Sequence, residues 1–405
     1  MTNTLIVIGG GQAAVSLVAK LRGLGDNRTI VLVSEESVVP YQRPPLSKKY
    51  LLGEMDLARL LIRPERWYAD NNVTLHLGVS VAEIDRIERV VVLSNGDRIV
   101  YERLVLTTGS TPRVLPAAIG GDLGGVYTVR SLGDVDAMAH DFSPGRSVLV
   151  IGGGYIGLET AAVAAKLGLK VTVLEKAMRI LQRVAAPETS DYFRALHRKN
   201  AVQIREDTGL KRLLGVDGRV TAVELDTGEI IKIDFVVVGI GVRPNDGLAT
   251  AAGLETDDGI LVDGACRTSD PAILAAGDCA RFLLGDGLGR LESVQNAVDQ
   301  GEAAAESLAG HDVDYRPAPW FWSDQFDVKL QIAGLNTGYD RTVERPGKRE
   351  GALSVWYYRG DRLLAVDAMN DGATYMIASR LLKAGRSPSV EQIADPTLNL
   401  KALLS

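Results

Sequence analysis

The pattern of apolar and polar positions near the start of the chain predicts a strand, a helix and a second strand. Residues 4–35 begin with an apolar run of strand length, turn at Gly9, continue as an Ala- and Leu-rich stretch of helical period, and end in a second apolar run and Glu35. The same order recurs in residues 147–175, where the turn begins at Gly152 and the acid is Glu175. The copies stand 143 residues apart, a spacing that indicates a duplicated domain rather than a solenoid repeat.

Further runs indicate how the strands are arranged. Residues 148–151 and 235–238 are continuously apolar, as parallel strands buried on both faces of a sheet are. Residues 100–112 and 233–244 each read as a strand that leads into a glycine-containing turn and a proline, which is typical of a passage between domains. The chain is therefore predicted to be α/β, with two doubly wound, Rossmann-like nucleotide-binding domains.

From Trp320 onward the pattern changes to short β-rich segments separated by Gly and Asp turns. Such β-rich segments include residues 329–333, 353–358 and 363–369, and a helix at about residues 373–382 follows them. The tail therefore predicts a small C-terminal α+β domain rather than a third nucleotide domain.

Composition and charge exclude several classes of protein. Asp and Glu number 51 against 45 Lys and Arg, a balance that argues against a nucleic-acid-binding surface. The two cysteines, Cys266 and Cys279, lack the spacing of a dithiol centre, and the four histidines are dispersed, so no disulfide framework and no metal site are predicted. No apolar run reaches membrane-spanning length and no signal peptide precedes Gly9, so we expect a soluble, cytoplasmic protein.

The two glycine-rich turns carry the first chemical prediction. Gly9-x-Gly11-x-x-Ala14 and Gly152-x-Gly154-x-x-Gly157 let the backbone approach a pyrophosphate at a helix N-terminus. One such turn is a weak signal, but two copies, each between a strand and a helix and each followed by an acid, indicate two dinucleotides. Glu35 and Glu175 are suited to accept hydrogen bonds from a ribose diol.

The acid of the second copy bears on the choice of nucleotide. Glu175 would repel a 2′-phosphate, which favours NADH over NADPH. Lys176 and Arg179 are close enough in sequence to leave NADPH open as an alternative. Two dinucleotides in one chain suggest hydride transfer between a tightly held flavin and a visiting nicotinamide.

A third candidate site lies where the first nucleotide domain is expected to resume, after residue 245. Asp278 follows Gly277 at the end of an apolar strand and offers a carboxylate to a flavin ribityl hydroxyl, or it could be a helix N-cap. The helix that begins near Ser293 could direct its positive N-terminus at a reduced flavin.

Six segments together resemble the single-chain ferredoxin reductases that serve oxygenases, the putidaredoxin reductase family. They are residues 40–48 (PYQRPPLSK), the paired glycine turns, residues 277–279 (GDC), 292–297 (ESVQNA) and 320–325 (WFWSDQ). The resemblance implies a glutathione-reductase-like fold with an FAD domain of residues 1–112 and 245–318, an NADH domain of residues 113–244 inserted in it, and a C-terminal domain of residues 319–405 that covers the flavin and helps to dock an iron–sulfur protein.

The motifs and the resemblance together assign site residues. The FAD contacts are expected to be Gly9, Gly11, Ala13, Ala14, Glu35, Arg43, Lys48, Val81, Thr108, Arg130, Asp278, Val294 and Trp320. The NADH contacts are expected to be Gly152, Gly154, Ile156, Gly157, Glu159, Glu175 and Gly241. Trp320 lies in an aromatic run, so it either covers the flavin or nicotinamide pocket or belongs to the core.

Lys48 and Glu159 are the predicted catalytic residues. The resemblance implies that they meet near the reactive flavin nitrogen, where the lysine stabilises the electron density that arrives on the flavin and the glutamate holds the lysine and orients the nicotinamide amide. Without the resemblance, a solvated lysine and an ordinary helix glutamate would be the simpler interpretation.

The resemblance also implies the direction of electron flow. Cys279 has no partner cysteine nearby, so electrons are expected to leave the flavin directly. NADH would deliver a hydride to FAD, and single electrons would pass to a [2Fe–2S] ferredoxin that supplies a haem-thiolate monooxygenase or another oxygenase. Docking is expected to be transient and electrostatic, with basic candidates Arg63, Arg66, Arg316, Arg341, Arg345, Lys348 and Arg349.

Two other functions remain as alternatives. An NADH oxidase or peroxidase would carry a redox cysteine early in the FAD domain, and residues 41–47 contain none. An NADH-responsive signalling flavoprotein similar to apoptosis-inducing factor would have a basic nucleic-acid-binding surface and a targeting segment, neither of which the sequence indicates. The oligomeric state is not predicted.

Overall fold

The computed structural model describes residues 3–404, which form two compact units. Unit 1 consists of Met1–Arg43, Met55–Thr111 and Val242–Pro317, and unit 2 of Pro44–Glu54, Pro112–Gly241 and Ala318–Ser405. The short segment Pro44–Glu54 therefore belongs with the later parts of the chain, a placement that the sequence does not indicate. The predicted boundaries of the FAD, NADH and C-terminal domains stay predictions.

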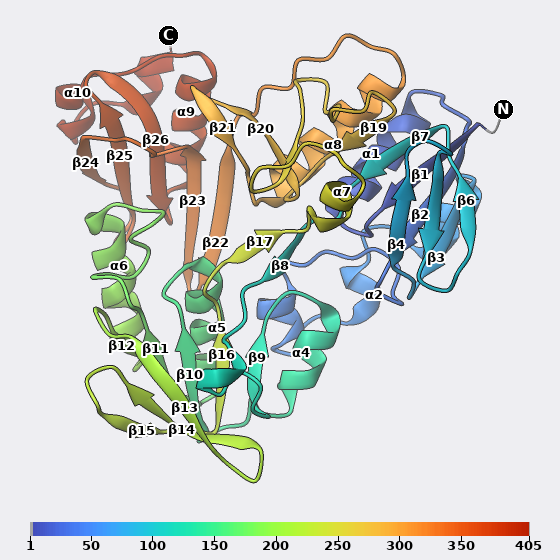
Figure 1. The fold of residues 1–405 in the computed structure, drawn as a ribbon. Coiled ribbons are helices and arrows are strands. Elements are labelled where there is room, and N and C mark those ends of the chain that lie inside the picture. Colours follow the sequence, from blue (N-terminus) through green and yellow to red (C-terminus); the bar gives the residue numbers. More distant parts are fainter. Residues whose placement is uncertain (1–2, 405) are drawn as a thin grey trace. The chain divides into compact units, whose positions relative to one another are not determined.

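Unit 1 is built on a five-stranded parallel sheet with the strand order β19-β7-β1-β2-β3 (Figure 1). Because successive side chains of a strand point to opposite faces, Leu5 and Val7 of β1 enter one apolar core while Ile6 and Ile8 enter another. The strands are β1 (Thr4–Ile8), β2 (Thr29–Ser34), β3 (Val73–Leu77), β7 (Arg103–Leu106) and β19 (Ile273–Ala275).

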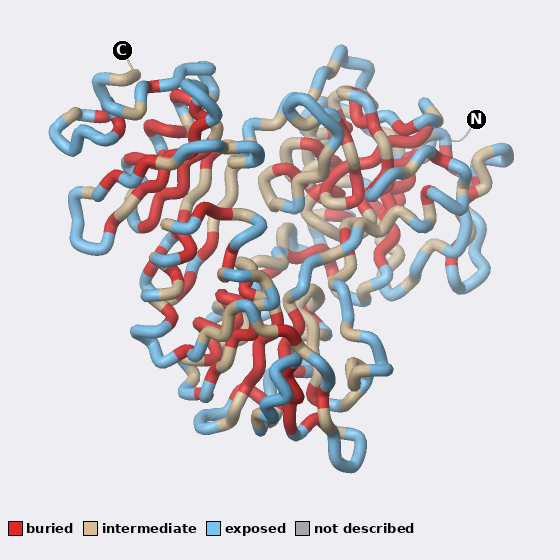
Figure 2. Tube along the Cα trace, turned by 60° about the vertical axis from the view of Figure 1, so that its left-hand side comes forward, coloured by how far each residue is buried: buried red, intermediate tan, exposed pale blue. Residues whose placement is uncertain are grey.

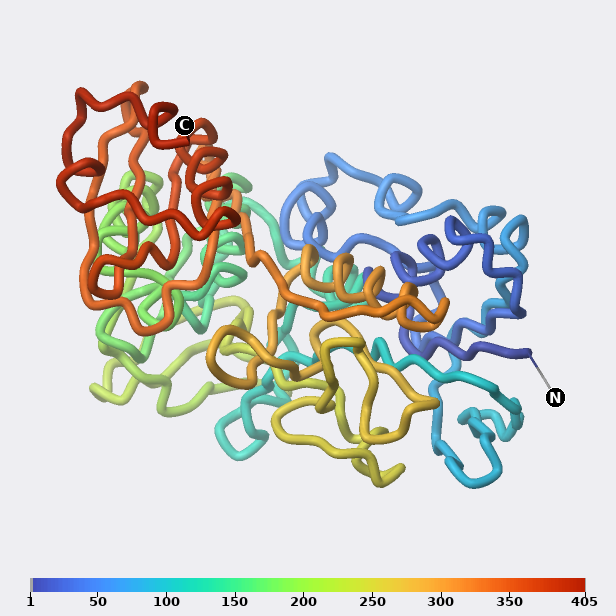
Figure 3. Tube along the Cα trace, turned by 90° about the horizontal axis from the view of Figure 1, so that it is seen from above, coloured from blue at the N-terminus to red at the C-terminus, as the bar shows by residue number. Residues whose placement is uncertain are grey.

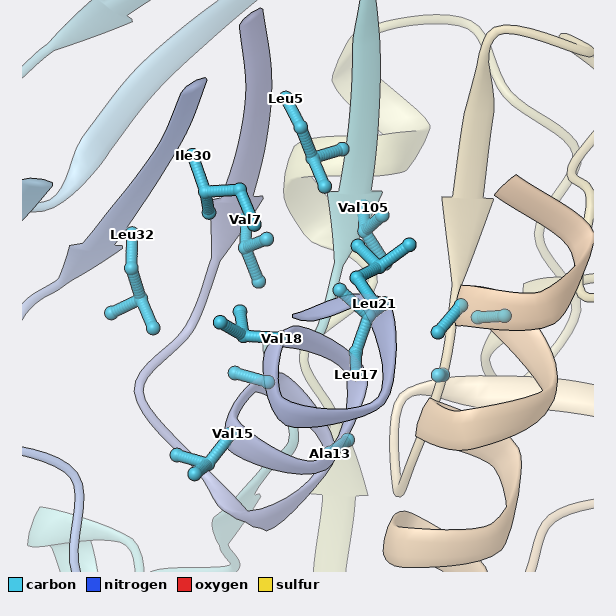
Figure 4. Close-up of a cluster of buried hydrophobic side chains, with 14 of the residues drawn as sticks. Leu5, Val7, Ala13, Val15, Leu17, Val18, Leu21, Ile30, Leu32 and Val105 are labelled. Carbon is cyan, nitrogen blue, oxygen red and sulfur yellow. The ribbon is translucent and has the colours of Figure 1, made fainter. Parts of the chain in front are cut away.

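Two helices, α1 (Gln12–Gly23) and α8 (Val294–Leu308), pack against each other beside one face of this sheet (Figure 4). Leu17, Val18 and Leu21 of α1 are fully buried there. The two helices approach so closely that a Cβ atom at Gly301 of α8 would lie 2.5 Å from the carbonyl oxygen of Ala13. Gly301 therefore sets the distance between the helices.

The other face of the sheet is covered by apolar residues of a small antiparallel sheet and of neighbouring segments. The small sheet consists of β4 (Val81–Asp85), β5 (Val90–Leu93) and β6 (Arg98–Val100). The remaining elements of unit 1 are α2 (Leu57–Leu60), α3 (Glu65–Asp70), α7 (Gly247–Ala251), β18 (Ile260–Leu261), β20 (Ala280–Leu284) and β21 (Gly287–Gly289). The paired strands β8 (Ser110–Pro112) and β17 (Val242–Pro244) lie where the chain passes between the units.

Unit 2 contains a second five-stranded parallel sheet, with the order β12-β11-β10-β16-β9. Its strands are β9 (Val126–Thr128), β10 (Ser147–Ile151), β11 (Lys170–Leu174), β12 (Gln203–Arg205) and β16 (Phe235–Val238). Associated with it are η1 (Leu46–Tyr50), η2 (Ala117–Ile119), α4 (Leu132–Ala139), α5 (Tyr155–Lys166), α6 (Pro187–Lys199) and an antiparallel sheet of β13 (Leu210–Val216), β14 (Arg219–Leu225) and β15 (Ile230–Lys232).

The C-terminal part of unit 2 is a five-stranded antiparallel sheet with the order β22-β23-β26-β25-β24. In Figure 3 this part, drawn orange to red, lies beside the green residues of the same unit. Its elements are β22 (Trp320–Gln325), β23 (Val328–Gly334), β24 (Arg341–Pro346), β25 (Leu353–Arg359), β26 (Arg362–Met369), α9 (Gly372–Lys383), α10 (Val390–Ala394) and η3 (Leu400–Leu404).

Buried polar contacts join α6 to the antiparallel sheet. Thr189 of α6 donates a hydrogen bond to Asp367 Oδ2 of β26 over 2.8 Å, and the Tyr357 hydroxyl of β25 donates to the same oxygen. Burial raises the pKa of the Asp367 carboxyl to about 6, although both hydrogen bonds oppose that shift. The C-terminal sheet is thus tied to helix α6 of the same unit through groups shielded from water.

The structure confirms the predicted α/β class, and it confirms the three segments named as β-rich in the tail and the helix that follows them. Strands β22 and β24 of the same sheet were not among the segments named. The strands of the sheets are largely buried and the connecting loops are largely exposed, as the red and pale blue segments of Figure 2 show. This difference explains why apolar runs in the sequence predicted the strands. Within residues 3–404, no helix is both long enough and apolar enough to cross a membrane.

Substitution Gly301→Ala tests the close packing of α1 and α8. We expect it to lower the free energy of unfolding by about 1–3 kcal/mol, because the new methyl group must push the helices apart. The matched control is Gly247→Ala in α7, where no atom lies within 4 Å of the added Cβ. Urea unfolding of both variants gives the comparison, and equal stabilities would contradict the packing argument.

Candidate functional site

The two glycine-rich turns have the same backbone shape. Gly9 and Gly152 have φ angles of +113° and +106°, in the region that only glycine adopts readily. A Cβ atom at Gly9 would lie 2.2 Å from the carbonyl oxygen of Thr107, and one at Gly152 would lie 2.3 Å from that of Gly239. In both units the turn therefore depends on glycine and brings the backbone close to the adjacent strand.

Each turn leads into the open N-terminus of a helix of 12 residues. Gly11 and Gly154 are the N-cap residues of α1 and α5, and neither supplies a side chain to cap the first N–H groups. No described atom lies within 4 Å of a Cβ built on either glycine. Free N–H groups, a positive helix end and open space in front fit a dinucleotide pyrophosphate, so both turns suit the predicted nucleotides.

The predicted ribose-binding acids differ between the copies. Glu175 accepts hydrogen bonds from the backbone N–H groups of Gly153 and Ala177, each over 2.7 Å. Its carboxylate is therefore held beside the second turn with lone pairs to spare. Glu35 is exposed, and the side chain next to the middle glycine of the first turn is Ser34, whose Oγ would lie 2.6 Å from a Cβ at Gly10.

Lys48 and Glu159, the predicted catalytic residues, form an ion pair inside unit 2. Lys48 Nζ lies 2.9 Å from Glu159 Oε1, and the two side chains are 15% and 8% exposed. Lys48 departs from helical backbone angles within η1, at φ −127° and ψ −108°, while Glu159 is the fifth residue of α5. The simpler interpretation, a solvated lysine apart from an ordinary helix glutamate, is wrong.

Strand β22 completes the surroundings of this ion pair. Ser323 Oγ donates a hydrogen bond to Glu159 Oε1 over 2.7 Å, and Asp324 Oδ2 lies 3.8 Å from Lys48 Nζ. Burial raises the pKa of the Glu159 carboxyl, while Lys48 and Ser323 act to lower it. Sequence reasoning did not assign Ser323 or Asp324 a role, although both stand in the segment WFWSDQ that carried the resemblance.

Asp278 lies in a polar cluster of unit 1. Its Oδ2 accepts a hydrogen bond from Ser110 Oγ over 2.9 Å, and the preceding Gly277 N–H donates to Gln300 Oε1 over 2.8 Å. The alternative that Asp278 is a helix N-cap is wrong, because the described chain turns at this residue and enters strand β20 rather than a helix. Helix α8 begins later and is capped by Ser293, whose side chain accepts from the Asn296 N–H. The sequence did not indicate Ser110 and Gln300, because their hydrogen-bond partners lie 168 and 23 residues away along the chain.

Other predicted residues have defined surroundings in unit 1. Arg43 pairs with Glu36 over 2.6 Å, a partner that the sequence analysis did not identify. Thr108 Oγ1 donates to the carbonyl oxygen of Asn245 over 2.6 Å. The turn residues Ala13 and Ala14 are buried at the start of α1, and Val81 and Val294 begin β4 and α8.

The remaining predicted contacts belong to unit 2. Trp320 of β22 is partly buried and its ring packs against Trp322 and Tyr375, with centroids 5.5 and 6.5 Å apart. Arg130 lies just before α4, and Ile156 in the first turn of α5 is 47% exposed. Gly241 is exposed, whereas the third motif glycine, Gly157, is buried so tightly that its Cβ would lie 2.1 Å from the carbonyl oxygen of Gly152.

The cysteines have the properties of core residues. Cys266 and Cys279 are free and fully buried in unit 1, and burial raises the pKa of both thiols, that of Cys266 to about 12. Thiols in that state are poor nucleophiles. Among residues 3–404, no three His, Cys, Asp or Glu side chains are grouped so that they could hold a metal ion.

One of the basic residues proposed for docking is not on the surface. Arg345 of β24 is buried, and its guanidinium donates to the backbone carbonyl oxygens of Ile393, Asp395 and Leu398. It holds the C-terminal segment in place, so the expectation that it contributes to a docking patch is wrong. Arg63, Arg66, Arg316, Arg341, Lys348 and Arg349 are exposed.

Two family models match the chain. Residues 3–301 match the family described as pyridine nucleotide-disulphide oxidoreductase, and residues 320–404 match the reductase C-terminal family. Rhodocoxin reductase of Rhodococcus erythropolis is 42% identical over 404 residues, which cover 99% of this chain and 94% of that protein. Putidaredoxin reductase of Pseudomonas putida is 39% identical over 409 residues, covering 100% and 97%.

Solved structures agree with these relatives. The covalent putidaredoxin reductase–putidaredoxin complex contains a chain that matches with a TM-score of 0.95 at 39% identity, covering 99% of this chain and 98% of that one. The ferredoxin reductase of the CYP199A2 system from Rhodopseudomonas palustris matches with a TM-score of 0.95 at 38% identity, covering all of both chains. The chain therefore belongs to the pyridine nucleotide-disulphide oxidoreductase family and, within it, to the ferredoxin reductases.

Proposed function

We propose that the chain is an NADH:ferredoxin oxidoreductase that holds FAD and passes electrons to a [2Fe–2S] ferredoxin of an oxygenase system. The observation that carries this proposal is the pair of matched dinucleotide turns in one chain whose relatives along their full length are ferredoxin reductases. The buried, separate cysteines support direct transfer without a disulfide relay. FAD supplies the conversion of a hydride, which carries two electrons, into single-electron transfer.

Unit 1 supplies the groups that would hold FAD. The first turn, with Gly9, Gly11, Ala13 and Ala14, presents free N–H groups to the pyrophosphate, and the exposed Glu35 accepts from the adenosine ribose. Asp278, whose Oδ2 accepts a hydrogen bond from Ser110 Oγ, is the carboxylate proposed to accept from a ribityl hydroxyl. Arg43, Val81, Thr108 and Val294 complete the contacts proposed within unit 1, and Arg130 and Trp320 stay predictions from the sequence.

Unit 2 supplies the groups that would hold NADH. The turn of Gly152, Gly154 and Gly157 receives its pyrophosphate, and Glu175 accepts from the adenosine ribose diol. Ile156 and Gly241, both exposed, are the apolar and backbone contacts proposed for the nucleotide.

The Lys48–Glu159 ion pair is the charged group proposed for the hydride-transfer step. An ammonium ion held in a partly buried position stabilises negative charge that develops nearby far better than a lysine in water does. Glu159 keeps that ammonium in place and has a second carboxylate oxygen that can accept from the nicotinamide amide.

The proposed ferredoxin partner is recognised by charge. Ferredoxins of this type are acidic, whereas the chain itself has a net charge of −6, so docking needs local basic residues. Of the exposed candidates, Arg316 and Arg341 also face Asp314 and Asp361, and ion pairs this exposed leave the arginines available to a partner. Contacts of this kind are screened by salt, which makes the docking transient.

A two-step anaerobic experiment tests the function. In a stopped-flow instrument, NADH is expected to bleach the flavin absorbance of the purified yellow protein, and a [2Fe–2S] ferredoxin added next is expected to be reduced. A reduced flavin that reacts with oxygen or peroxide but with no ferredoxin would favour an oxidase. Absence of bleaching would contradict the NADH assignment.

Substitution Lys48→Met tests the ion pair directly. We expect the rate of flavin reduction by NADH to fall about 100-fold, the usual effect of removing one electrostatic contact to developing charge. Lys49→Met is the matched control, since Lys49 lies next in η1 but is exposed. Equal losses in the two variants would contradict a specific role for Lys48.

Substitution Glu175→Ala tests nucleotide selectivity. We expect the preference for NADH over NADPH, measured as the ratio of kcat/KM values, to fall about tenfold, since a carboxylate that accepts from the ribose diol and repels a 2′-phosphate is lost. Glu206→Ala serves as control, because Glu206 holds the Ile180 N–H and Arg194 of the same unit instead. An unchanged preference in Glu175→Ala would remove this residue from the proposed contacts.

A further inference from the structure

A chain of buried hydrogen bonds leads from Glu159 into helix α6. Ser323 Oγ lies 2.7 Å from Glu159 Oε1, and Gln325 Nε2 lies 3.1 Å from Ser323 Oγ. The next link joins Gln325 Oε1 to His197 Nε2 over 2.8 Å. Ser323, Gln325 and His197 are each 0% exposed, so water does not compete for these contacts.

Glu159 determines which group donates and which accepts in each of these three hydrogen bonds. Its Oε1 faces the Lys48 ammonium, which can only donate, so the same oxygen accepts from Ser323 as well. The single hydroxyl proton of Ser323 is used in that bond, so Ser323 must accept from the amide group of Gln325. The amide oxygen of Gln325 then faces His197 and must accept from its Nε2–H.

This order defines the state of His197. The ring carries its proton on Nε2, and no described residue forms a hydrogen bond with its buried Nδ1. Burial lowers the pKa of the imidazole to about 4, so the ring is neutral at physiological pH. Phe326 packs edge-on against the ring, with centroids 5.1 Å apart, and restricts its rotation.

We propose that Ser323, Gln325 and His197 are positioning residues that aim a row of donors at Glu159 and thereby keep its carboxylate ionised and fixed on Lys48. The inference deepens the proposed function and rests on it, since Glu159 matters in this way only if the ion pair serves hydride transfer. No sequence pattern pointed to His197, and its contact with Gln325 spans 128 residues.

The row of donors offsets two effects that are unfavourable to an ionised, fixed carboxylate at Glu159. Burial disfavours its charged form, and one ammonium group leaves the carboxylate free to turn about its own axis. A second donor on the same oxygen opposes both effects. Because each group in the row is already polarised by the next, the last bond to the carboxylate is strengthened.

The row also joins separate elements of unit 2. Glu159 lies on α5, which begins at the dinucleotide turn, Ser323 and Gln325 lie on β22, and His197 lies on α6. Ser323 and Gln325 are two residues apart and so share one face of the strand. The C-terminal sheet thereby takes part in setting the position of Glu159.

Substitution Ser323→Ala tests the proposal in the FAD-loaded protein. We expect the limiting rate of flavin reduction by NADH to fall about tenfold at pH 7 with little change in the NADH concentration at half-saturation. We also expect the lower limb of its pH profile to move up by about one unit, because losing a donor to the charged form raises the pKa of Glu159. The charged groups acting on Glu159, Lys48 from η1 and Asp324 from β22, are retained in this variant.

The matched control is Ser354→Ala, which removes another fully buried hydroxyl from the C-terminal sheet. Ser354 accepts from Trp356 Nε1 and has no contact with the row. We expect its rate and pH profile to match those of the unsubstituted protein. An unshifted profile in Ser323→Ala, or the same shift in Ser354→Ala, would overturn the proposal.

A second measurement is made on the unsubstituted protein, and a variant is used only to assign the signal. In ¹⁵N-histidine-labelled protein, which contains four histidines, the His197 signal is identified by its loss in His197→Gln. We expect the neutral Nε2–H form to persist from pH 5 to pH 9. A ring that titrates near its ordinary pKa of 6.5, or that carries its proton on Nδ1, would contradict the row of donors.

These readouts are separate from the test of the proposed function. A protein whose flavin is bleached by NADH but which reduces no ferredoxin would fail as a ferredoxin reductase. The pH profile of that first step and the state of His197 would still decide for or against the positioning row.

Discussion

A buried charge must be paired, and in this chain the pairing of Lys48 with Glu159 constrains the elements around it. An unpaired carboxylate at this position would lose its hydration without compensation, so η1, α5 and β22 must each place a polar group within hydrogen-bonding distance. The irregular backbone at Lys48 and the polar residue Ser323, directly after the three aromatic residues of β22, are consistent with that requirement. The chemistry proposed for the pair uses the same property, because a charge held away from water acts strongly on a charge that forms nearby.

The duplicated β-α-β unit supplies the frame for this pair and shows how one design is adapted to two nucleotides. Both copies keep the left-handed first glycine and the uncapped helix start, since these serve any pyrophosphate. They differ at the end of the second strand, where Glu175 is fastened beside its turn while Glu35 is exposed. In the proposed function, Glu175 would bind a nucleotide that enters and leaves at every turnover, so a fixed carboxylate is useful there. A cofactor that stays bound would place less demand on the corresponding contact of Glu35.

The C-terminal sheet contributes to the site from a distance in sequence. Its strand β22 brings Ser323 and Gln325 to Glu159, and its strands β25 and β26 bring Tyr357 and Asp367 to Thr189 of α6. Both sets of contacts are buried and polar, and such contacts are directional in a way that apolar packing is not. The sheet therefore locates α5 and α6 accurately within unit 2, in addition to any part it plays in recognising the ferredoxin.

The sequence by itself determined the α/β class, the two glycine-rich turns and the named strands of the tail, because local periodicity and short spacings encode them. The ordered set of motifs also predicted that Lys48 and Glu159 meet. Only the tertiary structure decided what the polar side chains contact: Asp278 accepts from Ser110 instead of capping a helix, Arg345 is buried instead of exposed, and His197 has a hydrogen-bond partner in Gln325. The physical reason is that these hydrogen bonds depend on ångström-scale proximity between groups 48 to 168 residues apart in the sequence, which no local pattern records. Hydrophobic period reports which face of an element is buried, and the fold alone decides what that face meets.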